Sequence, residues 1–116
     1  MTETFGTVLK AKRREAGVSQ RELAERVGLD FTYISKLEND RIPPPAADTL
    51  VKICQVLGIE PEELLALTGK LPSEVQETVG TKRAAQEFLR AAHKMNLTDD
   101  EWEALVKSLQ NLRGDS

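Results

Sequence analysis

The sequence has little of the chemistry on which enzymes and secreted proteins depend. Its 116 residues include one cysteine, Cys54, and one histidine, His93. A single cysteine excludes an internal disulfide, and these two residues are too few ligands for a metal site, so we expect both to be packing or surface residues. One histidine allows no convincing Ser/His/Asp or Cys/His arrangement, and a glycine-rich phosphate loop is absent. The sequence therefore predicts a protein that is not an enzyme and that holds no cofactor and no metal.

Long apolar runs are missing as well. No stretch approaches the roughly 18 apolar residues needed to span a bilayer, and the N-terminal MTETFG carries no basic region followed by an apolar one. We therefore expect a soluble cytoplasmic protein without membrane contact. With 40% hydrophobic residues in a chain of 116, one compact core or a small domain plus an appendage can form, but not two large domains.

Aromatic residues make up only 4% of the chain, and no run of β-branched residues alternates with polar ones as in a strand. Glycine and proline recur at intervals and divide the chain into helical pieces, so the predicted fold class is all-α. Up to Gly69 the apolar periodicity predicts five helices, at about residues 5–16, 19–28, 31–39, 46–57 and 61–68.

The connection between the second and third helices is very short. Ser19, with Glu22 three residues later, forms the capping-box pattern that starts a helix, and Asp30 is a favoured N-cap for the next helix. Only Gly28 and Leu29 lie between the second helix and that cap, which forces a sharp corner and excludes a long antiparallel hairpin. The pattern predicts a helix-turn-helix.

The third predicted helix has two clearly apolar inward positions, Ile34 and Leu37. Its opposite side, at about 100° per residue, carries four polar side chains: Thr32, Ser35, Lys36 and Asn39. This face is small, hydrogen-bonding and cationic, which suits a nucleic-acid groove. The alternative is the solvated face of an ordinary amphipathic helix.

Positive charge is scarce in the chain as a whole. The formal net charge is -3 at pH 7, whereas nucleic-acid-binding domains usually have a pI above about 9. Between Lys10 and Arg41, however, eight basic residues stand against six acidic ones, while from Leu71 onward six basic residues stand against eight acidic ones. We expect weak non-specific DNA affinity and binding that depends on well-placed contacts.

The segment SQRELAERVGLDFTYISKLENDR closely resembles the helix-turn-helix of Xre-type, lambda-repressor-like transcriptional regulators, and the likeness covers about residues 5–69. The resemblance implies a five-helix DNA-binding domain at residues 1–69, whose helix around Thr32 to Lys36 enters the major groove of double-stranded DNA. The DNA-binding residues predicted on this basis are Arg14, Gln20, Arg21, Phe31, Thr32, Tyr33, Ser35, Lys36, Asn39 and Arg41.

Individual side chains of this set have different expected roles. Lys36 can donate to O6 and N7 of guanine, and Thr32 can bond a base edge or touch a thymine methyl group. Phe31 is either a core aromatic or a thymine-methyl contact. Tyr33 is either a half-buried surface aromatic or a phosphate contact through its hydroxyl. Arg41, in the loop after the helix, is either a contact to the sugar-phosphate backbone or a solvated charge.

The resemblance also assigns structural roles. It implies that Gln20 holds a phosphate and buttresses the first recognition residues. It further implies an ion pair between Arg13 and Glu38, which links the first and third helices and keeps Glu38 off the binding surface. Two positions depart from the family: Ala46 starts the fourth helix, after three prolines, where a Ser or a similar cap is common, and Lys12 stands where an apolar residue is usual. Either the methylene stem of Lys12 covers the core, or the first helix is slightly rotated.

The residues after Gly69 are an addition to this domain. We predict a linker at residues 70–80, with one short helical turn after Ser73, and a helical extension at residues 81–116 whose last helix starts with a capping box at Thr98 and Glu101. An apolar stripe along the extension predicts either packing against the N-terminal domain or dimerisation, and we favour dimerisation. The predicted dimerisation residues are Phe88, Leu89, Trp102, Leu105, Leu109 and Leu112.

Together these features predict a sequence-specific DNA-binding transcriptional regulator, most simply a homodimeric repressor that reads an inverted-repeat operator through the helix at 31–39. The alternative is an antitoxin-like or adaptor protein-interaction module with the same fold. A fold-level analogy, based on the PPP loop and the LLALTGKLP stretch, adds a zinc metallopeptidase that acts on the regulator as a further expected partner.

Overall fold

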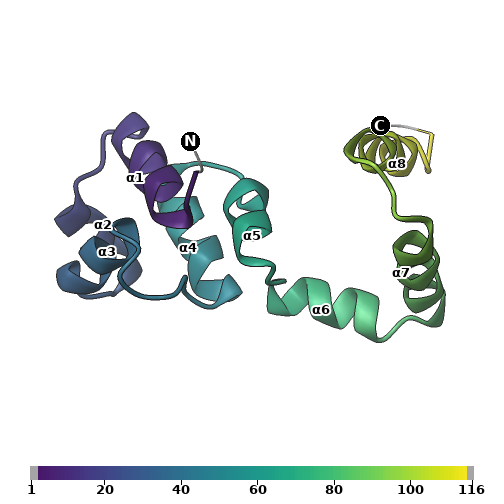
Figure 1. Ribbon diagram of the computed structural model, residues 1–116, viewed down its shortest axis with the longest axis horizontal. Helices are drawn as coiled ribbons and strands as arrows, with labels where there is room; N and C mark the ends of the chain where they lie inside the picture. Colours follow the sequence, from purple (N-terminus) through teal and green to yellow (C-terminus); the bar gives the residue numbers. More distant parts are fainter. Residues whose placement is uncertain (1–2, 115–116) are drawn as a thin grey trace. The chain divides into compact units, whose positions relative to one another are not determined.

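The computed structural model describes residues 3–114, and this part of the chain contains eight α-helices and no β-strand (Figure 1). The first five helices differ from the predicted ranges by at most one residue at either end, and the all-α prediction is confirmed. No helix within residues 3–114 has both the length and the apolar character needed to cross a membrane. The helices are α1 (Phe5–Glu15), α2 (Gln20–Val27), α3 (Phe31–Glu38), α4 (Ala47–Leu57), α5 (Glu62–Thr68), α6 (Ser73–Gly80), α7 (Arg83–Met95) and α8 (Asp99–Gln110).

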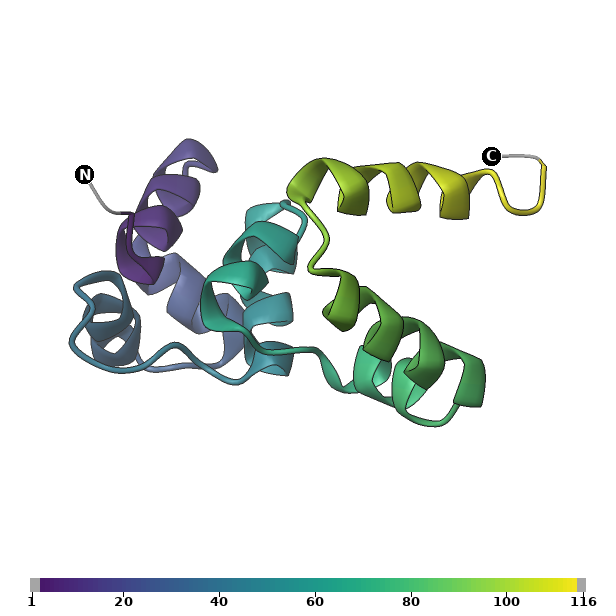
Figure 2. The same ribbon diagram turned by 45° about the vertical axis from the view of Figure 1, so that its right-hand side comes forward.

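The helices α1 to α5 surround one hydrophobic core (Figures 1 and 2). Helix α3 packs on α1 and α2, α4 packs on α2 and α5, and α1 also packs on α5. Burying one large aliphatic side chain contributes about 1.5–3 kcal/mol. Burial raises the pKa of the Cys54 thiol to about 11, and the expected packing role of this residue is confirmed. The most deeply buried side chains are Leu9, Leu23, Ile34, Leu37, Leu50, Ile53, Cys54 and Leu64.

The largest difference from the sequence prediction concerns residues 70–80. Instead of a linker with one short turn, α6 runs through eight residues of this segment. The first residue of α6 is held by α4: the backbone N–H of Ser73 donates to Asp48 Oδ1 at 2.9 Å, and the Ser73 hydroxyl donates to Asp48 Oδ2. These two hydrogen bonds hold the pKa of Asp48 below its usual value. They also anchor the first turn of α6 to the first turn of α4.

The chain divides into two compact units, Met1–Gln76 and Glu77–Ser116. The boundary falls within α6, three residues beyond its anchored first residue. The C-terminal unit holds α7 and α8, and α8 begins with the capping box that the sequence predicts: Thr98 Oγ1 accepts from the backbone N–H of Glu101, and Glu101 accepts from the backbone N–H of Thr98.

The start of α1 lies directly against the end of α3. A Cβ atom at Gly6 would stand 2.6 Å from the backbone oxygens of Leu37 and Glu38, so only glycine permits this approach. The backbone N–H of Gly6 donates to Asp40 Oδ1 at 2.8 Å, and the Thr4 hydroxyl donates to Asp40 Oδ2 at 2.6 Å. Asp40 has a left-handed φ of 57°. The segment that follows α3 is therefore held by the N-terminus of α1, where a carboxylate is favoured.

Lys12 is accommodated by an ion pair with α5. Its Nζ lies 3.1 Å from Glu63 Oε1, and the hydrogen bond and charge of Glu63 raise the pKa of Lys12 above its usual value. The Lys12 side chain is partly buried while its ammonium group reaches this carboxylate. The arrangement agrees with the alternative in which the stem covers the core and the charge stays at its edge.

Candidate nucleic-acid interface

The corner between α2 and α3 is built from three residues. Gly28 ends α2 with a left-handed φ of 73°, which glycine adopts without strain. The backbone N–H of Leu29 donates to Ala24 O at 2.8 Å, which completes the end of the helix. Asp30 then caps α3, because its Oδ1 accepts from the backbone N–H of Thr32 at 3.1 Å. The predicted helix-turn-helix is present in the structure.

Helix α3 has the two-sided character that its sequence predicts. Ile34 and Leu37 are buried in the core, whereas Thr32 and Lys36 are exposed on the other side, as is Asn39 just after the helix. Ser35 is half-buried, so this residue contributes less surface than expected. The exposed side of α3 thus carries hydroxyl, amide and ammonium groups.

The acidic residue of α3 is removed from this exposed side. Arg13 Nε donates to Glu38 Oε2 at 2.5 Å and Arg13 Nη2 donates to Glu38 Oε1 at 3.0 Å. Arg13 Nη1 donates to Val18 O at 2.9 Å, and both charged side chains are at least nine-tenths buried. The ion pair implied by the resemblance is confirmed. Because Glu38 is the only acid within α3, its burial leaves the exposed face without a carboxylate.

Gln20 joins the same cluster. Its Nε2 donates to Glu38 Oε1 at 2.9 Å, which couples the first residue of α2 to the last residue of α3. This bond reaches the last residue of α3 and not its first residues, so the expected buttressing of the first recognition residues by Gln20 stays a prediction. The amide nitrogen of Gln20 carries two N–H groups, and its bond to Glu38 uses one of them. A contact from the other N–H group to a phosphate stays a prediction.

Arg21 and Phe31 form a pair at the start of α3. The guanidinium carbon of Arg21 lies 4.6 Å from the centroid of the Phe31 ring, which is a cation–π geometry. Phe31 is 37% exposed, so the core interpretation of this ring is wrong. The pair presents a planar cation and an aromatic surface next to Thr32.

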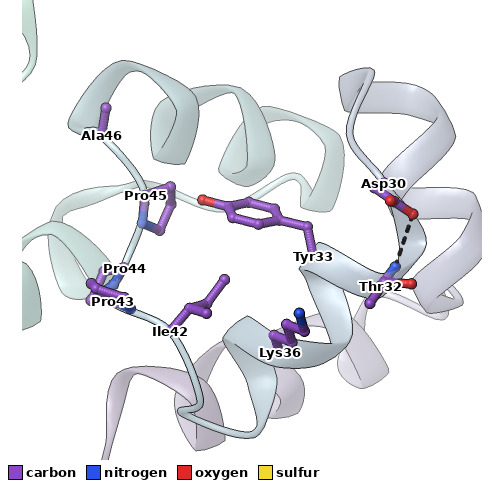
Figure 3. A pocket seen from close by; sticks show the side chains of 9 residues that line it. All are labelled: Asp30, Thr32, Tyr33, Lys36, Ile42, Pro43, Pro44, Pro45 and Ala46. Carbon is purple, nitrogen blue, oxygen red and sulfur yellow. Dashed lines mark hydrogen bonds between the residues drawn. The ribbon is translucent and has the colours of Figure 1, made fainter.

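A pocket of about 560 Å³ lies between α3 and the loop that follows it (Figure 3). The ring of Tyr33 extends from α3 toward Pro45 and forms one wall, and Ile42 forms another (Figure 3). Lys70 stiffens the far wall, because its Nζ donates to the carbonyl oxygens of Pro44 and Pro45 at 3.2 Å each. We name this hollow the α3 pocket; its lining residues are Asp30, Thr32, Tyr33, Lys36, Ile42, Pro43, Pro44, Pro45 and Ala46.

Ile42 and the proline run belong to this surface, although the sequence patterns did not predict it. The three consecutive prolines were the available signal, since each one fixes its φ and together they hold the loop extended. The helix that the loop faces depends on how α1 and α3 pack. The residues of the loop alone do not predict that packing.

The remaining predicted contact residues surround α3. Asn39 Nδ2 donates to Ser35 O at 2.9 Å and so closes the end of the helix. The backbone N–H of Arg41 donates to Lys36 O at 2.9 Å, and the Arg41 side chain is exposed. Arg14 is exposed on α1. These positions leave both arginine side chains accessible.

The predicted dimerisation residues lie on α7, on α8 and just after α8. They line or adjoin an apolar cleft of about 510 Å³ within the C-terminal unit, between α7 and α8. Phe88, Leu89 and Trp102 expose 40–48% of their surface, and Leu109 and Leu112 expose 69% and 74%. Leu105 is half-buried. An apolar surface of this kind is unusual for an unpartnered helix pair.

Residues 9–64 match the family described as Helix-turn-helix. The chain is 37% identical over 73 residues to the uncharacterized HTH-type transcriptional regulator Rv0474 of Mycobacterium tuberculosis (strain ATCC 25618 / H37Rv); the alignment covers 62% of this chain and 51% of that protein. The chain thus spans about half the length of that relative. It is also 31% identical over 98 residues to the HTH-type transcriptional regulator SinR of Bacillus subtilis (strain 168), covering 73% of this chain and 88% of SinR.

Two solved structures of SinR resemble this fold. The crystal structure of SinR, the master regulator for biofilm formation, in complex with DNA is similar with a TM-score of 0.50 and 34% identity, over 53% of this chain and 98% of that chain. A complex of SinR with the SinI protein is similar with a TM-score of 0.51 and 25% identity, over 97% of this chain and 100% of that chain.

Proposed function

Because this chain belongs to the helix-turn-helix family of transcriptional regulators, as its resemblance to Xre-type regulators predicts, we propose that it binds double-stranded DNA in a sequence-specific manner. Helix α3 enters the major groove, which at about 12 Å width admits one helix. The family is one of DNA-binding regulators and not of enzymes, in agreement with the sequence prediction.

The exposed face of α3 is the observation that carries this proposal. Thr32 and Lys36 project from a helix whose single acid, Glu38, is buried against Arg13. Lys36 donates to guanine O6 and N7, and Thr32 bonds a neighbouring base edge. The exposed side chain of Arg41 contacts the sugar-phosphate backbone. The SinR complex with DNA supports this use of the fold.

Gel-shift titration against the DNA upstream of its own gene, at rising salt concentration, tests the proposal. We expect the logarithm of the binding constant to fall linearly with the logarithm of the salt concentration. Lys36→Ala costs about 1–3 kcal/mol on the specific site and little on random DNA, whereas Arg41→Ala weakens both alike. Lys52→Ala, at an exposed lysine on α4, is the matched control. Unchanged specific binding by Lys36→Ala would reject the assignment of the recognition residues.

We further propose that the regulator acts as a homodimeric repressor on an inverted repeat. A single helix-turn-helix reads few base pairs, whereas a twofold dimer reads two half-sites one helical turn apart. The exposed side chains of Phe88, Trp102 and Leu109 support dimerisation through the C-terminal unit. Burying each of them contributes about 1.5–3 kcal/mol.

Two substitutions of exposed leucines test whether loss of the dimer depends on the C-terminal unit or on added charge anywhere in the chain. Leu109→Asp, in the apolar cleft of the C-terminal unit, should convert the dimer to a monomer in light scattering. Leu67→Asp, at a 45% exposed leucine on α5, should leave the mass unchanged. A monomeric mass for the unmodified chain, or an unchanged dimer in Leu109→Asp, would contradict the proposal.

A second candidate function is a protein-interaction module that works as an antitoxin or adaptor. The likeness to SinR in its complex with SinI, over 97% of this chain, favours a different protein as the partner of the C-terminal unit. Cleavage by a zinc metallopeptidase is a related proposal, because a cut after α5 would separate the DNA-reading helices from α7 and α8. The salt-dependent gel shift distinguishes these candidates, since an adaptor needs no specific DNA site.

A further inference from the structure

The α3 pocket shares Thr32 and Lys36 with the DNA contacts proposed above, whereas its other walls, Tyr33, Ile42 and the proline run, have no part in them. We propose that this pocket receives the 5-methyl group of a thymine adjacent to the base that Lys36 contacts. The inference rests on the proposed DNA-binding function, because the pocket meets base edges only when α3 lies in the major groove.

The pocket opens next to the exposed face of α3. Thr32 and Lys36 belong both to the exposed face of α3 and to the lining of the pocket, so the two surfaces are continuous. In Figure 3 the Tyr33 ring lies above Lys36 and the Ile42 side chain lies to its left. A base next to the one contacted by Lys36 therefore stands at the mouth of the pocket.

The walls of the pocket are mostly apolar. Tyr33, Ile42 and the proline run present carbon atoms to the pocket (Figure 3). Among the groups that base pairs show in the major groove, the thymine C5-methyl is apolar, whereas the others are hydrogen-bond donors or acceptors. An apolar wall matches this methyl group and would leave the polar groups of the other bases without partners.

The charged groups in the lining balance each other. Asp30, whose Oδ1 accepts from the backbone N–H of Thr32, and Lys36 both line the pocket, so the lining carries no formal net charge. A neutral methyl group is compatible with such a lining.

The pocket is also preformed. The prolines fix the loop, and the bonds from Lys70 to the carbonyl oxygens of Pro44 and Pro45 hold it to the segment after α5. Little conformational freedom is lost when the methyl group enters. At about 560 Å³ the pocket is wider than one methyl group, so the contact is partial and the expected gain is modest.

The experiment replaces each thymine of the operator, obtained by selection from random DNA, by deoxyuridine, which lacks only the methyl group. For the unmodified full chain we expect one thymine in each half-site at which this replacement weakens binding about four-fold. In Ile42→Ala the difference between thymine and uracil at that position should disappear. Ile59→Ala, a half-buried isoleucine of the same core that does not line the pocket, should retain it.

Three other results overturn the inference. If specific binding exists but no thymine differs from uracil, the pocket reads no methyl group while the proposed function stands. If a sensitive thymine exists and Ile42→Ala keeps the difference, the methyl group is read elsewhere, for example by Phe31. If selection yields no operator, the proposed function fails and the inference fails with it.

Discussion

The N-terminal and C-terminal units place similar apolar patterns in opposite environments. Leu9 and Leu50 are fully buried in the N-terminal unit, whereas Phe88, Trp102 and Leu109 expose 48%, 41% and 69% of their surface in the C-terminal unit. Each of these residues belongs to an apolar stripe with helical spacing on its own helix. Five helices can enclose a core, but two helices leave one side of each stripe uncovered. An apolar stripe therefore indicates that another surface must cover it. It does not indicate whether that surface belongs to the same chain or to a second molecule.

Charged pairs show the same contrast. Arg13 and Glu38 are buried with side-chain exposures of 9% and 1%; Arg13 also donates to Val18 O, and Glu38 also accepts from Gln20. Arg83 and Glu87 on α7 are 93% and 68% exposed and form an ordinary i, i+4 pair at 3.2 Å. Water screens the second pair almost completely. The first pair links α1 to α3, whereas the second joins two positions on the surface of a single helix.

The largest effect on stability should come from breaking the buried ion pair, with the exposed pair as the comparison. Glu38→Ala leaves the Arg13 charge buried without its carboxylate, so we expect a loss of about 3–5 kcal/mol in the free energy of unfolding. Glu87→Ala should change it by less than about 0.5 kcal/mol. Urea unfolding followed by circular dichroism measures both. Similar losses of unfolding free energy in the two variants would show that burial does not determine how much each ion pair contributes to stability.

A leucine in each unit provides the next comparison. Leu50→Ala should cost about 2–5 kcal/mol at any protein concentration, because it leaves a cavity in the core of the N-terminal unit. Leu109→Ala should cost less than about 1 kcal/mol at low concentration and should mainly weaken self-association. Thermal unfolding at several protein concentrations distinguishes the two. A concentration-independent loss of several kcal/mol in Leu109→Ala would mean that the C-terminal unit has its own closed core.

Two helical glycines give a smaller effect of opposite sign. Gly6→Ala forces a Cβ atom to 2.6 Å from backbone oxygens at the end of α3, and we expect a loss of about 1–3 kcal/mol. Gly80→Ala meets no atom within 4 Å and should be neutral or stabilise the chain by up to about 1 kcal/mol. Denaturant midpoints measure the difference. A neutral Gly6→Ala would contradict the close contact between α1 and α3.

The smallest effect concerns pH and the start of α6. Hydrogen bonds from Ser73 lower the pKa of Asp48 from its ordinary value of 3.8, so the folded state favours the charged carboxylate. The resulting stabilisation is fully present above pH 3.8 and is lost as the pH falls below it. Asp48→Asn should therefore be less stable than the unmodified chain at neutral pH, and this gap should narrow as the pH falls below 3.8. If the difference in stability between the two proteins did not change with pH, the loss in Asp48→Asn would come from packing and not from the charge of Asp48.

Much of the candidate site was readable in the sequence because its signals are local. Ser19 and Asp30 mark helix starts, Gly28 marks the corner, and the spacing of Ile34 and Leu37 defines which side of α3 is buried. The length of α6 was not readable: its segment is polar, and its contact with Asp48, 25 residues earlier, is not visible in the segment itself. The exposure of Phe31 was left open for a different reason, because its angular position lies at the border of the core.

The sequence by itself determined the all-α class, the helix-turn-helix corner and the chemistry of the exposed face of α3, because capping and periodicity act over a few residues. Tertiary structure alone decided that Gly6 lies against α3, that Gln20 reaches the buried Glu38, and that the proline run forms a pocket beside Lys36. These contacts join residues that are distant in the chain, and the packing of whole helices is what brings them together.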